Sequence, residues 1–411
     1  MRKGIAGKKE AWIIIAIGLT ALLLYTACGT TPTVPVERKV VEFGNLTPLT
    51  GPTSAAEQSG WQGMEDYVRY FNEEKSIPGV VIKHSWIDTD FQMSLAISAY
   101  RKSIDRGVVC LYSNHAEALP GVVPNLGKDR VPMVTGIQND YLYYPPGWVY
   151  GVAPTYAEIF TVLADYIREN WQEERPPRLA FMGIDAQFTW GAVEQGTKYA
   201  ESIGIEILPT EIVPMPPLDT STQLLRLSER GADFVYIQMI PVVTLPILRD
   251  AERLGLLGEI QFGGSDYSFG EVVIKGAGAA CEGYLLPKVT PWWDETEVPG
   301  IKLMIDNQMK YHGKEVSERF PGYDGCWRAA AVICEAIRRA GEKVGYENVD
   351  GRAVKEALDS MKDFDIYGLS TVSYTPEDHR GCTRAAVYQV KDGKVIRVSD
   401  WRETPMLVHG G

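Results

Sequence analysis

From residue 40 onward, short apolar segments alternate with segments whose apolar residues recur at helical spacing. This alternation restricts the chain to an α/β fold, in which helices cover both faces of a mostly parallel sheet. Residues 40–46 and 80–87 are predicted as the first two strands, and the intervening helix places Met64 and Phe71 on one face. Further strands are predicted at 108–112 and 131–135, each separated from its neighbour by a helix.

The same alternation restarts after Ala153 and Pro154. Predicted strands at 179–182, 205–213, 233–238 and 260–263 again have helices between them. Two such runs in 411 residues predict two doubly wound, Rossmann-like lobes. Because open sheets of this class bind ligands beyond the carboxyl ends of their strands, the cleft between the lobes is the expected site.

The first 27 residues have the pattern of a secretory signal peptide. Basic residues precede an apolar stretch at 11–24, and small residues lead to Cys28. This resembles a bacterial lipobox, although Tyr25 occupies a position that is usually aliphatic. We therefore expect a lipid anchor on Cys28, a flexible tether over 28–37 and a location outside the cytoplasmic membrane. An ordinary cleaved signal and an uncleaved anchor are the alternatives.

Charge and motif content exclude several classes of function. The formal net charge of -12 becomes -15 without the four bases and one acid of residues 1–27, so nucleic acid is not an expected partner. The glycine-rich segment 121–128 has one residue too many for a phosphate loop, and no histidine pair has zinc-protease spacing. No catalytic residue, metal or cofactor is predicted.

Several segments, in order along the chain, resemble the branched-chain amino-acid (Leu/Ile/Val) binding proteins. They are Thr47-Pro48-Leu49-Thr50-Gly51-Pro52, Val131-Pro132-Met133-Val134-Thr135, Tyr150-Gly151-Val152-Ala153-Pro154, Gly231-Ala232-Asp233-Phe234-Val235-Tyr236, Glu282-Gly283-Tyr284 and Gly322-Tyr323-Asp324. Together they extend over nearly all of residues 40–400.

The resemblance implies a type I periplasmic binding fold, of the Venus-flytrap kind, with three crossovers between the lobes. We expect these near Ala153, Leu286 and Gly368. The first lobe would comprise residues 38–153 and 287–367, and the second 154–286 and 368–411. The implied function is solute binding for an ABC importer, whose permease would be the partner.

The resemblance also implies a set of ligand contacts on the first lobe. The family holds the ligand carboxylate with hydroxyls and backbone amides after the third strand, where this chain has Ser113, Asn114, His115 and Ala116. His115 could donate a hydrogen bond to a carboxylate or carbonyl, or it could simply be a packed or exposed histidine. A second set of donors is expected after the fourth strand, at Thr135, Gln138 and Asn139.

On the second lobe, the family's two binding tyrosines correspond to Phe188 and Ile240. Trp190, two residues after Phe188, is a further candidate contact. An aromatic residue of the first loop corresponds to Ala56, which leaves room for a larger or flatter ligand, an aromatic one included. The acidic residue that neutralises the ligand ammonium corresponds to Asp266, whose alternative role is a turn or helix-cap aspartate.

The sequence therefore predicts a binding protein for an amino acid or a related small carboxylate or amide. A sensory receptor of the same fold is the alternative, since the ligand could signal instead of being transported. A hydrolase on a related α/β scaffold is a third hypothesis, and it would turn over the bound ligand.

Overall fold

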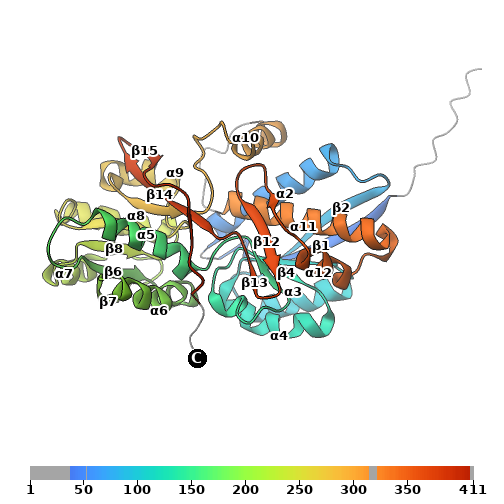
Figure 1. The fold of residues 1–411 in the computed structure, drawn as a ribbon, viewed down its shortest axis with the longest axis horizontal. Helices are drawn as coiled ribbons and strands as arrows, with labels where there is room; N and C mark the ends of the chain where they lie inside the picture. The colour runs from blue at the N-terminus through green and yellow to red at the C-terminus, as the bar shows by residue number, and fades with distance from the viewer. Residues whose placement is uncertain (1–37, 52, 314–321, 408–411) are drawn as a thin grey trace, which may run out of the picture. The chain divides into compact units, whose positions relative to one another are not determined.

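The computed structural model describes residues 38–51, 53–313 and 322–407. The predicted signal peptide, tether and lipidated Cys28 lie outside these residues. Residues Lys39–Gly411 form one compact unit, which contains two separate large sheets with their helices (Figure 1).

The first lobe is built on a parallel sheet of order β2-β1-β3-β4-β5. Its strands are β1 (Lys39–Thr47), β2 (Val80–Asp88), β3 (Leu111–Ser113), β4 (Met133–Thr135) and β5 (Val149–Gly151). The buried run at the end of β1 fits a strand covered on both faces, because helices pack on either side of it.

In the described residues, the helices that cover this sheet include α2 (Ser54–Glu74), α3 (Met93–Asp105), α4 (Leu119–Asp129), α11 (Tyr323–Val344) and α12 (Gly351–Asp359). Helix α11 packs along α2, although α2 ends at Glu74 and α11 begins only at Tyr323.

 The two helices bury apolar faces against each other: Tyr67 of α2 meets the Trp327 ring of α11 edge-on, with ring centroids 4.6 Å apart. This packing brings residues 323–344 back onto the first lobe.

The second lobe is built on a mixed sheet of order β15-β14-β10-β9-β8-β6-β7. Its strands are β6 (Arg178–Gly183), β7 (Glu206–Ile212), β8 (Phe234–Ile237), β9 (Gln261–Gly264), β10 (Leu285–Lys288), β14 (Arg384–Lys391) and β15 (Lys394–Arg397), and the short β16 (Arg402–Glu403) pairs with β14. Strands β6 to β10 run parallel, whereas β14 is antiparallel to β10.

The helices of this lobe are α5 (Tyr156–Asn170), α6 (Gln187–Ser202), α7 (Ser221–Glu229), α8 (Pro241–Arg253) and α9 (Glu271–Ala277). A capping box starts α5, in which the Thr155 hydroxyl accepts from the Glu158 amide while the Glu158 carboxylate accepts from the Thr155 amide. The predicted α/β fold with two doubly wound lobes is confirmed.

The segments that join the lobes follow β5, β10 and β13. After β10 the chain forms α10 (Pro299–His312), and after α12 it forms a small antiparallel sheet of β11 (Phe364–Asp365), β12 (Thr371–Thr375) and β13 (Asp378–Gly381). Strand β13 packs against β5, so the chain enters the second sheet only at β14. Short 3₁₀ turns lie at Ala116–Ala118, Asp140–Leu142, Gly278–Cys281 and Tyr346–Asn348.

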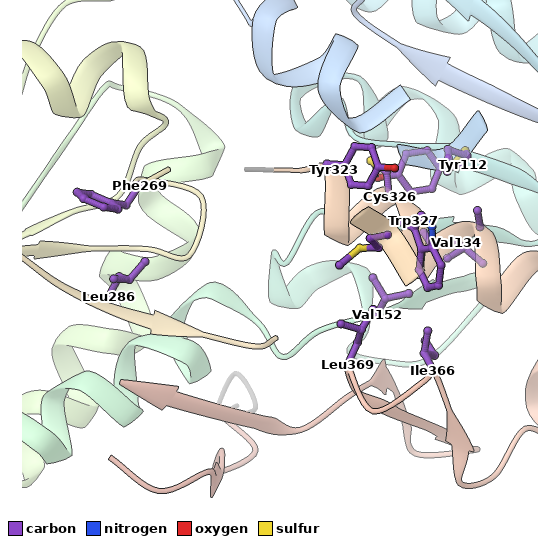
Figure 2. Close-up of a cluster of buried hydrophobic side chains, with 14 of the residues drawn as sticks. Tyr112, Val134, Val152, Phe269, Leu286, Tyr323, Cys326, Trp327, Ile366 and Leu369 are labelled. Carbon is purple, nitrogen blue, oxygen red and sulfur yellow. The ribbon is translucent and has the colours of Figure 1, made fainter. Parts of the chain in front are cut away.

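The largest buried cluster centres on α11. Figure 2 shows Trp327, Tyr323 and Cys326 on this helix, near Tyr112, whereas Phe269 and Leu286 lie apart from them in the second lobe. The Trp327 side chain is fully buried. All five cysteines of the described residues are free and buried.

Candidate functional site

A cavity lies at the carboxyl ends of strands from both sheets. The space in it that protein atoms leave empty has a volume of about 660 Å³, part of which is open to solvent. Its walls are mainly apolar and come from both lobes. The lining residues are Thr53, Ala56, Glu57, Phe91, Asn114, Ala116, Glu117, Ile137, Tyr156, Ile184, Ala186, Phe188, Met215, Met239, Ile240 and Tyr267.

Most of these residues are placed by the same topological rule. Asn114 directly follows β3, Ile184 follows β6, and Met239 lies two residues beyond β8. The loops after parallel strands gather at one edge of each sheet, which puts their side chains in one place. The cavity is thus where the sequence predicted the site to be.

Three helices begin at this cavity. Thr53, Ala186 and Ile240 are the residues that precede α2, α6 and α8, and all three line the cavity. None of them accepts a hydrogen bond from its helix through its side chain. The positive ends of these three helix dipoles therefore give this part of the cavity a partial positive charge, which suits a carboxylate or carbonyl oxygen.

Glu57, in the first turn of α2, is the buried acidic group of the cavity. Its side chain accepts a hydrogen bond of 3.1 Å from the Thr47 hydroxyl and one of 3.2 Å from the Asn114 amide. Burial raises the pKa of Glu57 to about 8, and these two hydrogen bonds only partly oppose that effect. Glu117, which follows Asn114 by three residues, also lines the cavity, and burial raises its pKa as well.

A family model described as periplasmic binding protein matches residues 40–394. The chain belongs to this family. A search of curated proteins found no match.

Solved structures of the family have the same fold. A branched-chain amino acid ABC transporter protein from Thermus thermophilus, solved with bound valine, is 25% identical; the match covers 89% of this chain and 97% of that one, with a TM-score of 0.82. A leucine-binding protein from Thermotoga maritima is 20% identical over 87% of this chain and 98% of its own, with a TM-score of 0.72. The type I periplasmic binding fold expected from the sequence is confirmed.

Four of the predicted contact residues line the cavity of this family member: Asn114, Ala116, Phe188 and Ile240. Ala56, where the sequence predicted extra room, lines it as well. Phe188 lies edge-on to Tyr156 with ring centroids 4.8 Å apart, so two aromatic rings form one wall. This wall favours an apolar or aromatic portion of a ligand.

Ser113, His115 and Thr135 are buried and are not among the lining residues. The Ser113 hydroxyl donates to the Leu46 carbonyl and the Thr135 hydroxyl to the Ser113 carbonyl, so both tie neighbouring strand ends together. The His115 ring stacks on Phe91, with centroids 4.8 Å apart, and burial lowers the pKa of His115 to about 4. At neutral pH this histidine is therefore uncharged.

Gln138, Asn139 and Trp190 also lie outside the lining set. Gln138 and Asn139 instead join the lobes: the Gln138 carbonyl accepts from the Tyr156 amide, and the Asn139 side chain donates to the Gln187 carbonyl at 3.0 Å. Trp190 is 40% exposed, and its indole N–H donates to Asp185.

Asp266 is buried among charged groups at the junction of the lobes. Burial raises its pKa to about 6, an effect that the nearby charge of Lys288 opposes. Arg328 also lowers the pKa of Asp266, and Asp324 raises it. The cavity is lined by the next residue, Tyr267, whose hydroxyl donates to the Gly136 carbonyl of the first lobe at 3.1 Å.

Most of the other lining residues were not predicted from the sequence, Glu57, Glu117, Tyr156 and Met239 among them. Glu57 directly follows Ala56, a position that the resemblance had marked, so an acidic residue one step further on was the available signal. The pair Trp292 and Trp293, which the sequence left open as cleft residues, is buried and lies outside the lining set.

Two further observations concern the described residues only. They contain no group of three or more histidine, cysteine, aspartate or glutamate side chains placed to hold a metal ion. None of their helices is both long enough and apolar enough to cross a membrane.

Proposed function

We propose that this protein is the extracytoplasmic solute-binding component of an ABC importer. It binds an amino acid or a related small carboxylate or amide in the cavity between the lobes. Membership of the periplasmic binding protein family supports a binding role, and the valine-bound relative from Thermus thermophilus supports both the transporter and the ligand class. Lipidation of Cys28 would keep the protein at the outer face of the membrane, beside its permease.

The convergence of three uncapped helix starts on one apolar cavity is the observation that carries this proposal. The positive dipole ends of these helices suit the carboxylate or carbonyl end of the ligand. Phe188, Tyr156 and Met239 suit an apolar or aromatic body. The site thus matches a small molecule with one polar end and one apolar end.

Binding would work by closure of the two lobes. We propose lobe boundaries at residues 38–153 with 287–381 and 154–286 with 382–407, later than the expected crossover near Gly368, because β13 packs against β5 of the first lobe. Cross-lobe hydrogen bonds such as Asn139 to Gln187 and Tyr267 to Gly136 would form on closure. A ligand that contacts both lobes stabilises the closed form by its extra affinity for that form. The permease would then recognise the closed surface.

Thermal unfolding of the purified protein with amino acids, aromatic acids and amides tests the proposal. A ligand at 100 times its dissociation constant should stabilise the protein by about 2.7 kcal/mol. Phe188→Ala should weaken that stabilisation, because it removes part of the apolar wall, whereas replacement of the exposed Leu218 by Ala should not. If no compound of these classes shifts the transition, the proposed function is wrong.

A further inference from the structure

Both acidic residues that line the cavity in the described part of the chain, Glu57 and Glu117, lie on the first lobe, and Glu57 is the more deeply buried of the two. Glu57 lines the cavity although its side chain is largely buried, with a residue exposure of 8%. Its hydrogen-bond partners, Thr47 and Asn114, are neutral. No lysine, arginine or histidine is among the described residues that line the cavity, so the protein itself supplies no cation to pair with Glu57.

A buried hydrogen-bond acceptor accompanies this carboxyl group. The Asn114 side chain lines the cavity, and its Oδ1 is buried and accepts no hydrogen bond from the described residues. The orientation of this amide is set by its donor, because its nitrogen donates to the Glu57 carboxyl group. An unpaired buried acceptor next to a carboxyl group favours a ligand group rich in N–H donors.

Asp266 is in a different electrostatic situation. Lys288 and Arg328 both act on its carboxyl group, and Lys288 also lies 3.8 Å from Asp324. The charge of Asp266 is thus partly offset inside the protein, against the effect of Asp324, and Asp266 does not line the cavity. An ammonium group in the cavity would gain more from Glu57, which lacks a cationic partner.

We propose that Glu57, and not Asp266, binds the ammonium group of the ligand, and that the ligand is an amino acid with a large apolar side chain. This inference rests on the proposed function. The amine would contact Glu57 and Asn114 on the first lobe, and the carboxylate would face the starts of α6 and α8 on the second. The apolar side chain would lie between them, against Phe188.

Proton release is a direct consequence. The titratable groups that act on Glu57, or on which it acts, are Glu117, Tyr112 and Cys326, and none of them is a cation. Without ligand the carboxyl group is mostly protonated at neutral pH, because its pKa is about 8. Pairing with an ammonium group requires the carboxylate, so binding releases a proton to the buffer. Affinity should rise by up to about tenfold per pH unit as the pH approaches 8.

Titration calorimetry of the unaltered protein tests the inference with two matched pairs of compounds. The pairs are leucine with 4-methylpentanoate, and phenylalanine with 3-phenylpropanoate, measured at pH 6, 7 and 8 in buffers of different ionisation enthalpy. At least one amino acid should bind at least tenfold more tightly than its partner that lacks the amine, and should release close to one proton at pH 7.

Glu57→Gln should reduce the affinity for that amino acid at least tenfold and abolish the proton release. Glu65→Gln, a matched control on the same helix with its carboxylate paired to His84 outside the cavity, should change neither.

Each other outcome is informative. Equal binding of an amino acid and its amine-free partner, or proton release that survives Glu57→Gln, would overturn the role of Glu57 and leave the proposed function standing. If amides or acids stabilise the protein but neither amino acid binds, the ligand class inferred here is wrong. If none of the compounds binds, both proposals are contradicted for ligands of this size.

Discussion

Replacement of Glu57 by Gln should change how the stability of the free protein depends on pH. The change removes an ionisable group while keeping its size and most of its hydrogen-bonding capacity. In the native protein the pKa of Glu57 is raised to about 8 from the ordinary value of 4.5, and burial is the main cause. A raised pKa means that the folded state holds a proton that the unfolded chain has already lost.

The sign and size of the effect follow from this difference. The stability associated with the protonated group is fully present below pH 4.5 and is lost as the pH rises toward 8. Within that window the free energy of unfolding of the native protein should fall, relative to Glu57→Gln, by about 1.4 kcal/mol per pH unit. Over the whole window the difference approaches about 5 kcal/mol as an upper value.

Urea unfolding at pH 5.5, 6.5 and 7.5 measures this difference. The free energies of unfolding of the native protein and of Glu57→Gln should move steadily apart as the pH rises. Those of the native protein and of Glu252→Gln, a change at an exposed residue of α8, should keep a constant difference. Parallel curves for the native protein and Glu57→Gln would refute the reasoning, because they would mean that Glu57 titrates alike in both states.

Three further substitutions probe closure and packing. Gly191→Ala would place a Cβ 2.2 Å from the Asn139 amide nitrogen, so it should hold the lobes apart. Titration calorimetry should then show ligand affinity lowered about tenfold or more. An unchanged affinity would contradict the closure geometry. Arg380→Ala leaves the buried Glu158 carboxylate, 2.8 Å from the Arg380 guanidinium, without this cation and should cost about 3–5 kcal/mol in urea unfolding. Trp327→Ala empties a fully buried site and should cost about 3–5 kcal/mol, and a loss below about 1 kcal/mol would show that the core can collapse around the gap.

The strand-and-helix alternation predicted the fold well because it reflects local physics. An apolar run such as β1 must be covered on both faces, and a helix such as α11 must bury its apolar side. The small sheet of β11, β12 and β13 was not predicted as such, because its pairing joins short segments whose register depends on their neighbours.

The candidate site was predicted less completely. The position of Asn114, Ala116, Phe188 and Ile240 follows from their place after strands or at helix starts, which is a topological property. Which side chains of a loop turn toward the cavity is not a topological property. His115 illustrates this, since it packs on Phe91 beneath the surface that its neighbours Asn114 and Ala116 line.

By itself the sequence determined the two α/β lobes, the edge of the sheets at which a ligand would lie, and the resemblance to a binding family, because all three depend on periodicity and order along the chain. Only the tertiary structure decided which carboxyl group lies near cationic side chains. Lys288 and Arg328 lower the pKa of Asp266 while Asp324 raises it, whereas the side chains that act on Glu57 are neutral or acidic. These neighbours come from distant parts of the chain, and the electrostatic energy of a buried group depends on them more than on its own position in the sequence.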